Sequence, residues 1–228
     1  MKKLIAIVAG EPNSINSEII SKAWKKNNNN NFFLIGNYML LKKQIHKIGI
    51  KISLNKIDTF DQIQQSKKLS VLNVPLKFKS IFKVNILDVR EYVLKCLNIA
   101  HKLALKKKIK GFINAPIDKK IFNKKYLGVT EYLASINNIK NKEVMMIYNK
   151  KLSVVPLTTH LEIKYITDKI KYNLIKTKIL TLNNSYIKLF KKKPKIALLG
   201  LNPHNSENHL NSIENKIISP AVVKLKKL

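Results

Sequence analysis

The sequence predicts an α/β fold with a largely parallel sheet. Short runs rich in β-branched residues alternate with longer segments of helical periodicity, which is the order of elements in which crossover helices join parallel strands. Hydrophobic residues make up 45% of the chain and charged residues 25%, as in globular proteins. A chain of 228 residues buries about 70% of its unfolded surface, which is enough for one large or two small domains.

The predicted strands are short runs of β-branched and other apolar residues. They cover residues 4–9, 32–36, 51–54, 111–115, 144–148, 153–157 and 195–199. Between them, helices are predicted over residues 17–25, 38–48, 89–106 and 163–190. In the third helix, apolar side chains recur near every 3.6 residues and most lysines fall toward the other face. Residues 56–84 are the least regular part, where we expect loops and at most a short strand.

The net charge of +31 first suggests a nucleic acid or a membrane surface as partner. Arg90 is the only arginine, however, and recognition of phosphates and base edges favours the planar guanidinium group. Lys, Asn and Ile are all in excess and share A/T-rich codons. We therefore attribute the charge to genome composition and expect neither nucleic acid nor membrane as partner. A lysine-rich polyanion-binding protein stays an alternative.

The cysteine content and the lengths of the apolar runs indicate in which cellular compartment the protein is expected. Cys96 is the only cysteine, so no disulfide forms within the chain, and a reducing environment is the simplest one. No apolar run approaches the ~20 residues of a membrane-spanning helix. The apolar run at residues 4–9 is shorter than the roughly 7–15 residues of a signal-peptide core. We expect a cytoplasmic protein.

Polar residues follow several predicted strands, and ligands of parallel α/β sheets bind beyond the carboxyl ends of the strands. The first such place, residues 9–18, offers Ser14 or Asn16 as a cap of the following helix, whose positive end favours an anion. The alternative is an ordinary loop. Only one glycine lies there, so this is no glycine-rich dinucleotide fingerprint.

A second place lies after residues 111–115. Asp118 and Lys119 provide a carboxylate and an ammonium group, and Thr130 follows with a hydroxyl group. These groups fit a phosphorylated ligand. The alternative is that Asp118 caps a helix and Lys119 is one of many surface lysines, and the spacing alone does not decide between the two.

Two histidines occupy the third and fourth places. His160 and His204 each come just past a predicted strand, so they are candidates to converge on one divalent ion. A catalytic metal site needs a third protein ligand, and the alternative is two structural histidines. His46 and His101 lie in helical patterns and are interpreted as structural, while His209 is a candidate for a supporting contact.

The four places together resemble the 4-hydroxythreonine-4-phosphate dehydrogenase family of vitamin B6 biosynthesis. The most specific pieces are Thr-Thr-His-Leu at residues 158–161 and Gly-Leu-Asn-Pro-His at residues 200–204. Weaker pieces are Gly-Glu-Pro at residues 10–12, Ala-Pro-Ile at residues 115–117 and Gly-Val-Thr-Glu at residues 128–131. All follow the family's order along nearly the whole chain.

The resemblance implies a three-layer α/β/α two-domain fold similar to isocitrate and isopropylmalate dehydrogenases, with domains at residues 1–110 and 111–228. It implies oxidation of 4-phosphohydroxy-L-threonine by NAD or NADP and decarboxylation to 3-amino-2-oxopropyl phosphate in pyridoxal 5'-phosphate biosynthesis. A divalent metal (Zn²⁺, Mg²⁺ or Co²⁺) would polarise the substrate hydroxyl. His160 and His204 would be metal ligands and Thr130 a substrate contact. Family members are homodimers with a shared active site.

The sequence also departs from the family. Val129 stands where the family usually has a histidine, and Ser14 and Asn16 replace glycines of the first loop. The chain ends before the family's C-terminal third, which would carry the third metal histidine. A catalytically dead, truncated remnant of the family is therefore an alternative to an active enzyme.

Overall fold

The structure is a computed structural model that describes residues 4–26, 31–64, 66–123, 125–139, 142–202, 204 and 210–227. The chain divides into two compact units, Met1–Lys125 and Tyr126–Leu228, which we call the first and the second unit. The sequence places its domain boundary earlier, after residue 110. In the structure, residues 111–114 form a strand that pairs with the first strand of the chain.

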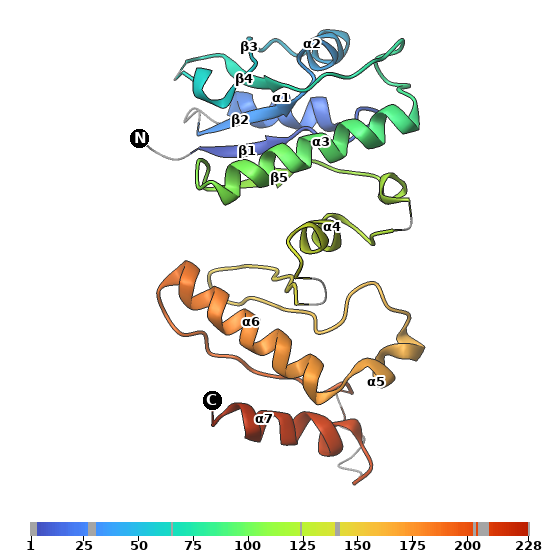
Figure 1. The fold of residues 1–228 in the computed structure, drawn as a ribbon, viewed down its shortest axis with the longest axis vertical. Helices are drawn as coiled ribbons and strands as arrows, with labels where there is room; N and C mark the ends of the chain where they lie inside the picture. Colours follow the sequence, from blue (N-terminus) through green and yellow to red (C-terminus); the bar gives the residue numbers. More distant parts are fainter. Residues whose placement is uncertain are drawn as a thin grey trace. The chain divides into compact units, whose positions relative to one another are not determined.

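A five-stranded sheet forms the centre of the first unit (Figure 1). Its strands are β1 (Ile5–Val8), β2 (Phe32–Gly36), β3 (Leu54–Ile57), β4 (Leu69–Asn73) and β5 (Gly111–Asn114). They lie in the order β3-β4-β2-β1-β5, and every neighbouring pair is parallel. The carboxyl ends of all the strands therefore meet at one edge of the sheet.

Helices cover both faces of this sheet (Figure 1). They are α1 (Asn16–Lys26), α2 (Tyr38–Lys47) and α3 (Ile86–Leu105), with short 3₁₀ turns at Phe60–Gln62 and Lys119–Phe122. α1 and α2 pack on the face that carries Leu34 and Val71. α3 connects β4 to β5 in the opposite direction across the sheet, so a right-handed crossover places it on the other face.

The central strand β2 shows why the sequence forms a covered sheet. Phe33, Leu34 and Ile35 are successive residues and all have 0% exposure. Successive side chains of a strand point to opposite faces, so an unbroken apolar run is stable only where both faces are covered. Asn37 ends the strand and begins α2, because its side chain accepts a hydrogen bond from the Leu40 N–H.

The second unit is mainly helical in its described residues. It contains α4 (Val129–Ile136), a 3₁₀ turn (Ile163–Tyr165), α5 (Ile166–Lys169), α6 (Tyr172–Phe190), a π-helical turn η5 (Glu214–Ile218) and α7 (Ser219–Leu225). A small apolar cluster joins three of these segments through Ile175, Ile218 and Ala221. Across the part of the chain that the structure describes, no helix is both long and apolar enough to cross a membrane.

The strand predictions are confirmed in the first unit with one shift, because β3 begins three residues later than expected. β4 occupies the middle of the segment that we expected to be irregular. In the second unit, the strands predicted at residues 144–148, 153–157 and 195–199 are wrong. Only an isolated antiparallel bridge between Ile147 and Val154 is found among them.

The physical reason is a lack of pairing partners. In the described residues of the second unit, no sheet forms beside these segments, and several of their apolar side chains are exposed, Leu199 by 80%. The predicted helix at residues 163–190 is also interrupted. Ile170 adopts an extended conformation and buries its side chain in the apolar cluster, so α5 ends and α6 starts as a separate helix.

Candidate functional site

The loops after β1 and β5 lie against each other at the carboxyl edge of the first sheet. Gly10 has a φ of +72°, a left-handed conformation that favours glycine. A Cβ atom at this position would lie 2.5 Å from Asn16 Nδ2, 2.6 Å from the Pro116 carbonyl oxygen and 2.9 Å from the Ala115 carbonyl oxygen. The close approach of the two loops therefore requires glycine.

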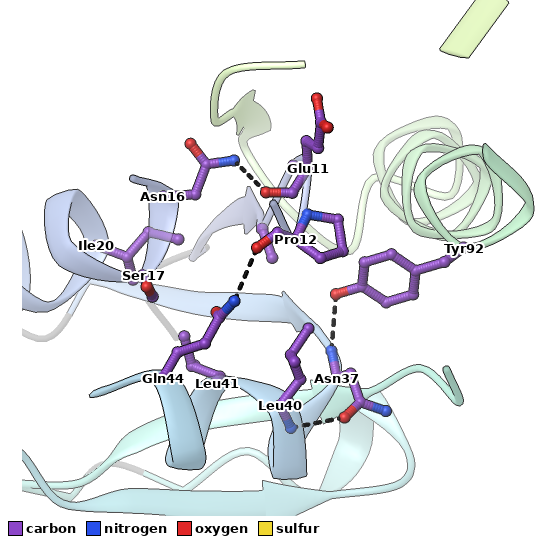
Figure 2. A pocket seen from close by; sticks show the side chains of 12 residues that line it. Glu11, Pro12, Asn16, Ser17, Ile20, Asn37, Leu40, Leu41, Gln44 and Tyr92 are labelled. Atoms are coloured by element: carbon purple, nitrogen blue, oxygen red, sulfur yellow. Dashed lines mark hydrogen bonds between the residues drawn. The ribbon is translucent and has the colours of Figure 1, made fainter. Parts of the chain in front are cut away.

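Asn16 joins these two loops, and Figure 2 shows its bond to Glu11. Its Nδ2 donates to the carbonyl oxygens of Glu11 at 3.1 Å and of Pro116 at 2.9 Å. The Glu11 N–H also donates to the Pro116 oxygen, at 3.1 Å. Just before α1, Ser14 Oγ accepts from the N–H of Asn16, the first residue of the helix, at 3.3 Å.

A small cavity of about 20 Å³ lies behind this loop. Several of the polar groups around it form hydrogen bonds, whereas the buried Asn16 Oδ1 has no partner among the described residues. Gln44 Nε2 donates to the Pro12 carbonyl oxygen at 2.7 Å, and the Tyr92 hydroxyl oxygen accepts from the Asn37 N–H at 2.8 Å (Figure 2). Gln44 Nε2 also donates to the Ile81 carbonyl oxygen at 2.6 Å. Burial raises the pKa of Tyr92 well above its usual value. A cavity of this volume is about large enough for one water molecule.

The segment after β5 is fixed by carboxylates. Glu11 Oε2 accepts from the Asp118 N–H at 3.1 Å, and Asp118 Oδ1 accepts from the Lys120 N–H at 2.9 Å. Asp118 therefore caps the short 3₁₀ turn that follows, as expected if this residue has a structural role. Lys119 is exposed in that turn.

The chain's only arginine also has a structural contact. Arg90 lies half-buried on α3, and its Nε donates to the Ile121 carbonyl oxygen at 2.9 Å. This bond ties the helix to the segment after β5. The guanidinium group thus holds the backbone at this edge of the sheet.

The three residues predicted to bind substrate and metal all lie in the second unit. Thr130 is exposed in the first turn of α4. His160 is exposed and has a φ of +54°, a left-handed conformation that is uncommon for residues other than glycine. His204 is exposed as well, and its backbone N–H donates to Asn202 Oδ1 at 3.0 Å.

The donor chemistry of these residues fits a divalent ion in part. Imidazole nitrogen is a good ligand for Zn²⁺ and similar ions, and a catalytic site uses three protein ligands. Among the residues that the structure describes, no group of three or more His, Cys, Asp or Glu side chains is placed to hold a metal ion. His209, the candidate for a supporting contact, lies outside the described residues.

One residue near this region was not predicted from the sequence. Glu214 is only 5% exposed, and its carboxylate accepts backbone hydrogen bonds from the loop that carries His204. The sequence offered one weak signal for this residue. Acidic residues are rare in the chain, 13 in all, and Glu214 is one of them, ten positions after His204.

Comparisons with known proteins agree on one family. The sequence model for "Pyridoxal phosphate biosynthetic protein PdxA" matches residues 28–228. A 4-hydroxythreonine-4-phosphate dehydrogenase of Sulfurihydrogenibium sp. is 32% identical over 97% of the chain and 70% of the relative. A D-threonate 4-phosphate dehydrogenase of Pectobacterium atrosepticum is 26% identical over 99% of the chain and 72% of the relative.

The fold comparison points the same way. The crystal structure of a 4-hydroxythreonine-4-phosphate dehydrogenase from Klebsiella pneumoniae superposes with a TM-score of 0.87 and 26% identity. The match covers 99% of this chain and 72% of that one. Both sequence and fold thus align with about 70% of the length of these relatives.

Proposed function

Because the chain belongs to the family of pyridoxal phosphate biosynthetic protein PdxA, a family of dehydrogenases, we propose that it oxidises 4-phosphohydroxy-L-threonine with NAD or NADP. The substrate's carbinol carbon gives a hydride to the nicotinamide ring, and its hydroxyl gives up a proton. The resulting β-keto acid loses CO₂ and leaves 3-amino-2-oxopropyl phosphate. This compound is consumed in the synthesis of pyridoxal 5'-phosphate.

The observation that carries the proposal is the extent of the family match. Residues 28–228 match, and this span contains Thr130, His160 and His204. The relative named for 4-hydroxythreonine-4-phosphate is 32% identical to the chain, against 26% for the relative named for D-threonate 4-phosphate. We therefore choose the first substrate and treat the second as its competitor.

Thr130 is the proposed substrate contact. It lies in the first turn of an eight-residue helix, where free backbone N–H groups and the helix dipole favour an anion. Its hydroxyl donates to the phosphorylated substrate. The preceding Val129 is apolar and half-buried, so its side chain offers no hydrogen bond there.

His160 and His204 are the proposed ligands of the divalent ion. A bound ion would polarise the substrate's alcohol oxygen and favour loss of its proton. Because two imidazoles fall short of the usual three protein ligands, we propose a homodimer whose partner subunit completes the site. Light scattering of the purified protein tests the dimer.

The test of the function is NADH formation by the purified full chain. The assay contains 4-phosphohydroxy-L-threonine or D-threonate 4-phosphate, with NAD or NADP and added Zn²⁺, Mg²⁺ or Co²⁺. We expect one NADH and one CO₂ for each molecule of the first substrate. No turnover of either substrate with any of these ions contradicts the proposal and favours an inactive member of the family.

The role of Thr130 has its own test in the same assay. We expect Thr130→Ala to raise KM roughly tenfold, because about 1–1.5 kcal/mol of hydrogen bonding to the substrate is lost. Thr130→Ser keeps the hydroxyl group and serves as the matched control. An unchanged KM in Thr130→Ala removes Thr130 from the site.

A further inference from the structure

Glu214 is a buried carboxylate at the start of the last helical segment. It is 5% exposed, although burying a charge is costly unless hydrogen bonds compensate. Its Oε1 accepts the backbone N–H of Leu201 at 2.9 Å and that of Asn202 at 3.1 Å. Hydrogen bonds to an ionised acceptor are stronger than neutral ones, so this single oxygen fixes two successive residues of the loop.

The contact reaches His204 through Asn202. The Asn202 N–H donates to Glu214, and Asn202 Oδ1 accepts from the His204 N–H at 3.0 Å. An Asn side chain that bonds the backbone two residues later forms an Asx turn, which sets the direction of the chain locally. Glu214 is therefore connected to the His204 backbone by two consecutive hydrogen bonds.

Glu214 itself stands on an anchored segment. Ser212, which is 7% exposed, accepts the Asn215 N–H on Oγ at 3.2 Å and the Lys216 N–H on its carbonyl oxygen at 3.0 Å. The π-helical turn that begins at Glu214 buries Ile218 in the apolar cluster of the second unit. The segment that carries the carboxylate is thus anchored by its own hydrogen bonds and by the packing of Ile218.

We propose that Glu214 is the positioning residue for His204: it fixes the Leu201–Asn202 backbone and, through Asn202, the point from which the imidazole reaches the metal ion. The inference rests on the proposed function, in which His204 is a metal ligand. Glu214 does not touch the ion or the substrate. Outer partners that orient metal ligands commonly change metal affinity by about 10–100-fold when they are removed.

The electrostatics of the contact agree with this geometry. The pKa of Glu214 lies below its ordinary value, first because its own backbone N–H donates to the carboxylate and then because the Asn202 and Leu201 N–H groups and the Ser212 hydroxyl do so. The carboxylate is consequently ionised at neutral pH, the form in which it accepts these bonds most strongly.

The experiment measures Co²⁺ binding and amide hydrogen exchange in the full chain. Glu214→Ala removes the acceptor, while Glu214→Gln keeps an oxygen in place without the charge. Asp168→Asn changes an exposed carboxylate on α5 of the same unit and is the matched control. Circular dichroism verifies that each variant is folded, and Glu214→Gln keeps the test valid if Glu214→Ala is not.

We expect Glu214→Ala to weaken Co²⁺ binding by about 10–100-fold and to alter the visible Co²⁺ spectrum, with Glu214→Gln between it and the wild type. The amides of Leu201 and Asn202 should exchange faster in Glu214→Ala, and Asp168→Asn should match the wild type. Unchanged exchange and unchanged Co²⁺ affinity in both Glu214 variants overturn the proposal.

The outcomes separate this inference from the proposed function. If His204→Ala binds Co²⁺ as tightly as the wild type, His204 is no ligand and the metal site of the proposed function fails. Faster amide exchange in Glu214→Ala would then show that Glu214 only stabilises the loop backbone, and the proposal that it positions a metal ligand would be wrong. If His204→Ala abolishes binding and the Glu214 variants do not weaken it, only the positioning role fails.

Discussion

The two units differ in how their apolar segments are used. In the first unit, the strands pair with parallel neighbours, and helices cover both faces of the sheet. In the second unit, segments of similar composition stay largely unpaired in the described residues, and Leu152 and Leu199 are 73% and 80% exposed. The candidate substrate and metal residues belong to this second, more open unit.

The difference shows that an apolar run becomes a strand only where neighbours satisfy its backbone groups. In the first unit, hydrogen bonds from Asn16 Nδ2 join the loops around Gly10 and Pro116, and the buried Asn16 Oδ1 has no hydrogen-bond partner in the described residues. In the second unit, the candidate side chains Thr130, His160 and His204 are exposed, and Glu214 accepts backbone hydrogen bonds from Leu201 and Asn202 in the loop before His204. The predictions below test this contrast.

The largest expected effect is a core substitution in the first unit. Phe33 has 0% exposure and contacts the Phe60 ring with centroids 5.5 Å apart. Phe33→Ala should lower the free energy of unfolding by roughly 3–5 kcal/mol, because it removes apolar contacts and leaves a cavity. Urea denaturation followed by fluorescence of Trp24, the only tryptophan, reports on this unit.

The matched control for Phe33 lies in the second unit. Leu152 is 73% exposed, so Leu152→Ala should change the free energy of unfolding by no more than about 0.5 kcal/mol, measured by circular dichroism. A loss of several kcal/mol would show that Leu152 is covered in solution and that the contrast between the units is wrong.

Cys96 tests how closed the first unit is. Burial raises the pKa of its thiol to about 12, and the residue is 1% exposed. At pH 8 we expect its reaction with a disulfide reagent to be roughly a thousandfold slower than that of a free thiol, because the thiolate is the reacting form. Reaction at the free-thiol rate without denaturant would contradict the burial of α3 against the sheet.

Substitutions at the two glycines with positive φ in the first unit distinguish the cost of backbone strain from the cost of a steric clash. Gly10 and Gly49 have φ angles of +72° and +73°, but a Cβ atom meets atoms within 3 Å only at Gly10. Gly49→Ala should cost about 1–2 kcal/mol from the backbone conformation alone. Gly10→Ala should cost clearly more in urea denaturation, and equal costs would show that the loops after β1 and β5 do not approach closely.

The smallest expected effect is the pH dependence that comes from Glu214. Because its pKa is lower in the folded chain, its contribution to stability is fully present above the unfolded pKa and is lost as the pH falls through the folded pKa. In Glu214→Gln, stability should fall less steeply below about pH 4. Circular dichroism of urea unfolding at several pH values measures this, and identical slopes would contradict the assignment.

Sequence patterns predicted the first unit well because its signals are local. The apolar run that forms β2 and the helical pattern that begins at residue 38 are readable without the fold. A short strand was allowed within residues 56–84, but the sequence did not locate β4, because its place in the sheet depends on pairing with β2 and β3. The strand predictions for the second unit are wrong for the same reason, since an apolar pattern does not show which strands would pair with the segment.

The candidate site was predicted only in part. Thr130, His160 and His204 stand out by residue type and by position after predicted elements, and their roles stay predictions. Glu214 could not be found this way, since its contacts with Leu201 and Asn202 depend on how the chain returns after His204. Asn16 was one of two candidates for a helix cap, with Ser14, and its side chain links two loops by a bond to a residue 100 positions away.

The central claim is that the metal chemistry of this chain belongs to the exposed histidines of the second unit. A calorimetric Zn²⁺ titration tests it most directly, with the wild type, the double variant His160→Ala/His204→Ala and the control His46→Ala, an exposed histidine on α2. The account predicts one binding site in the wild type and in His46→Ala, and its loss in the double variant. Equal affinity in the wild type and the double variant would contradict it.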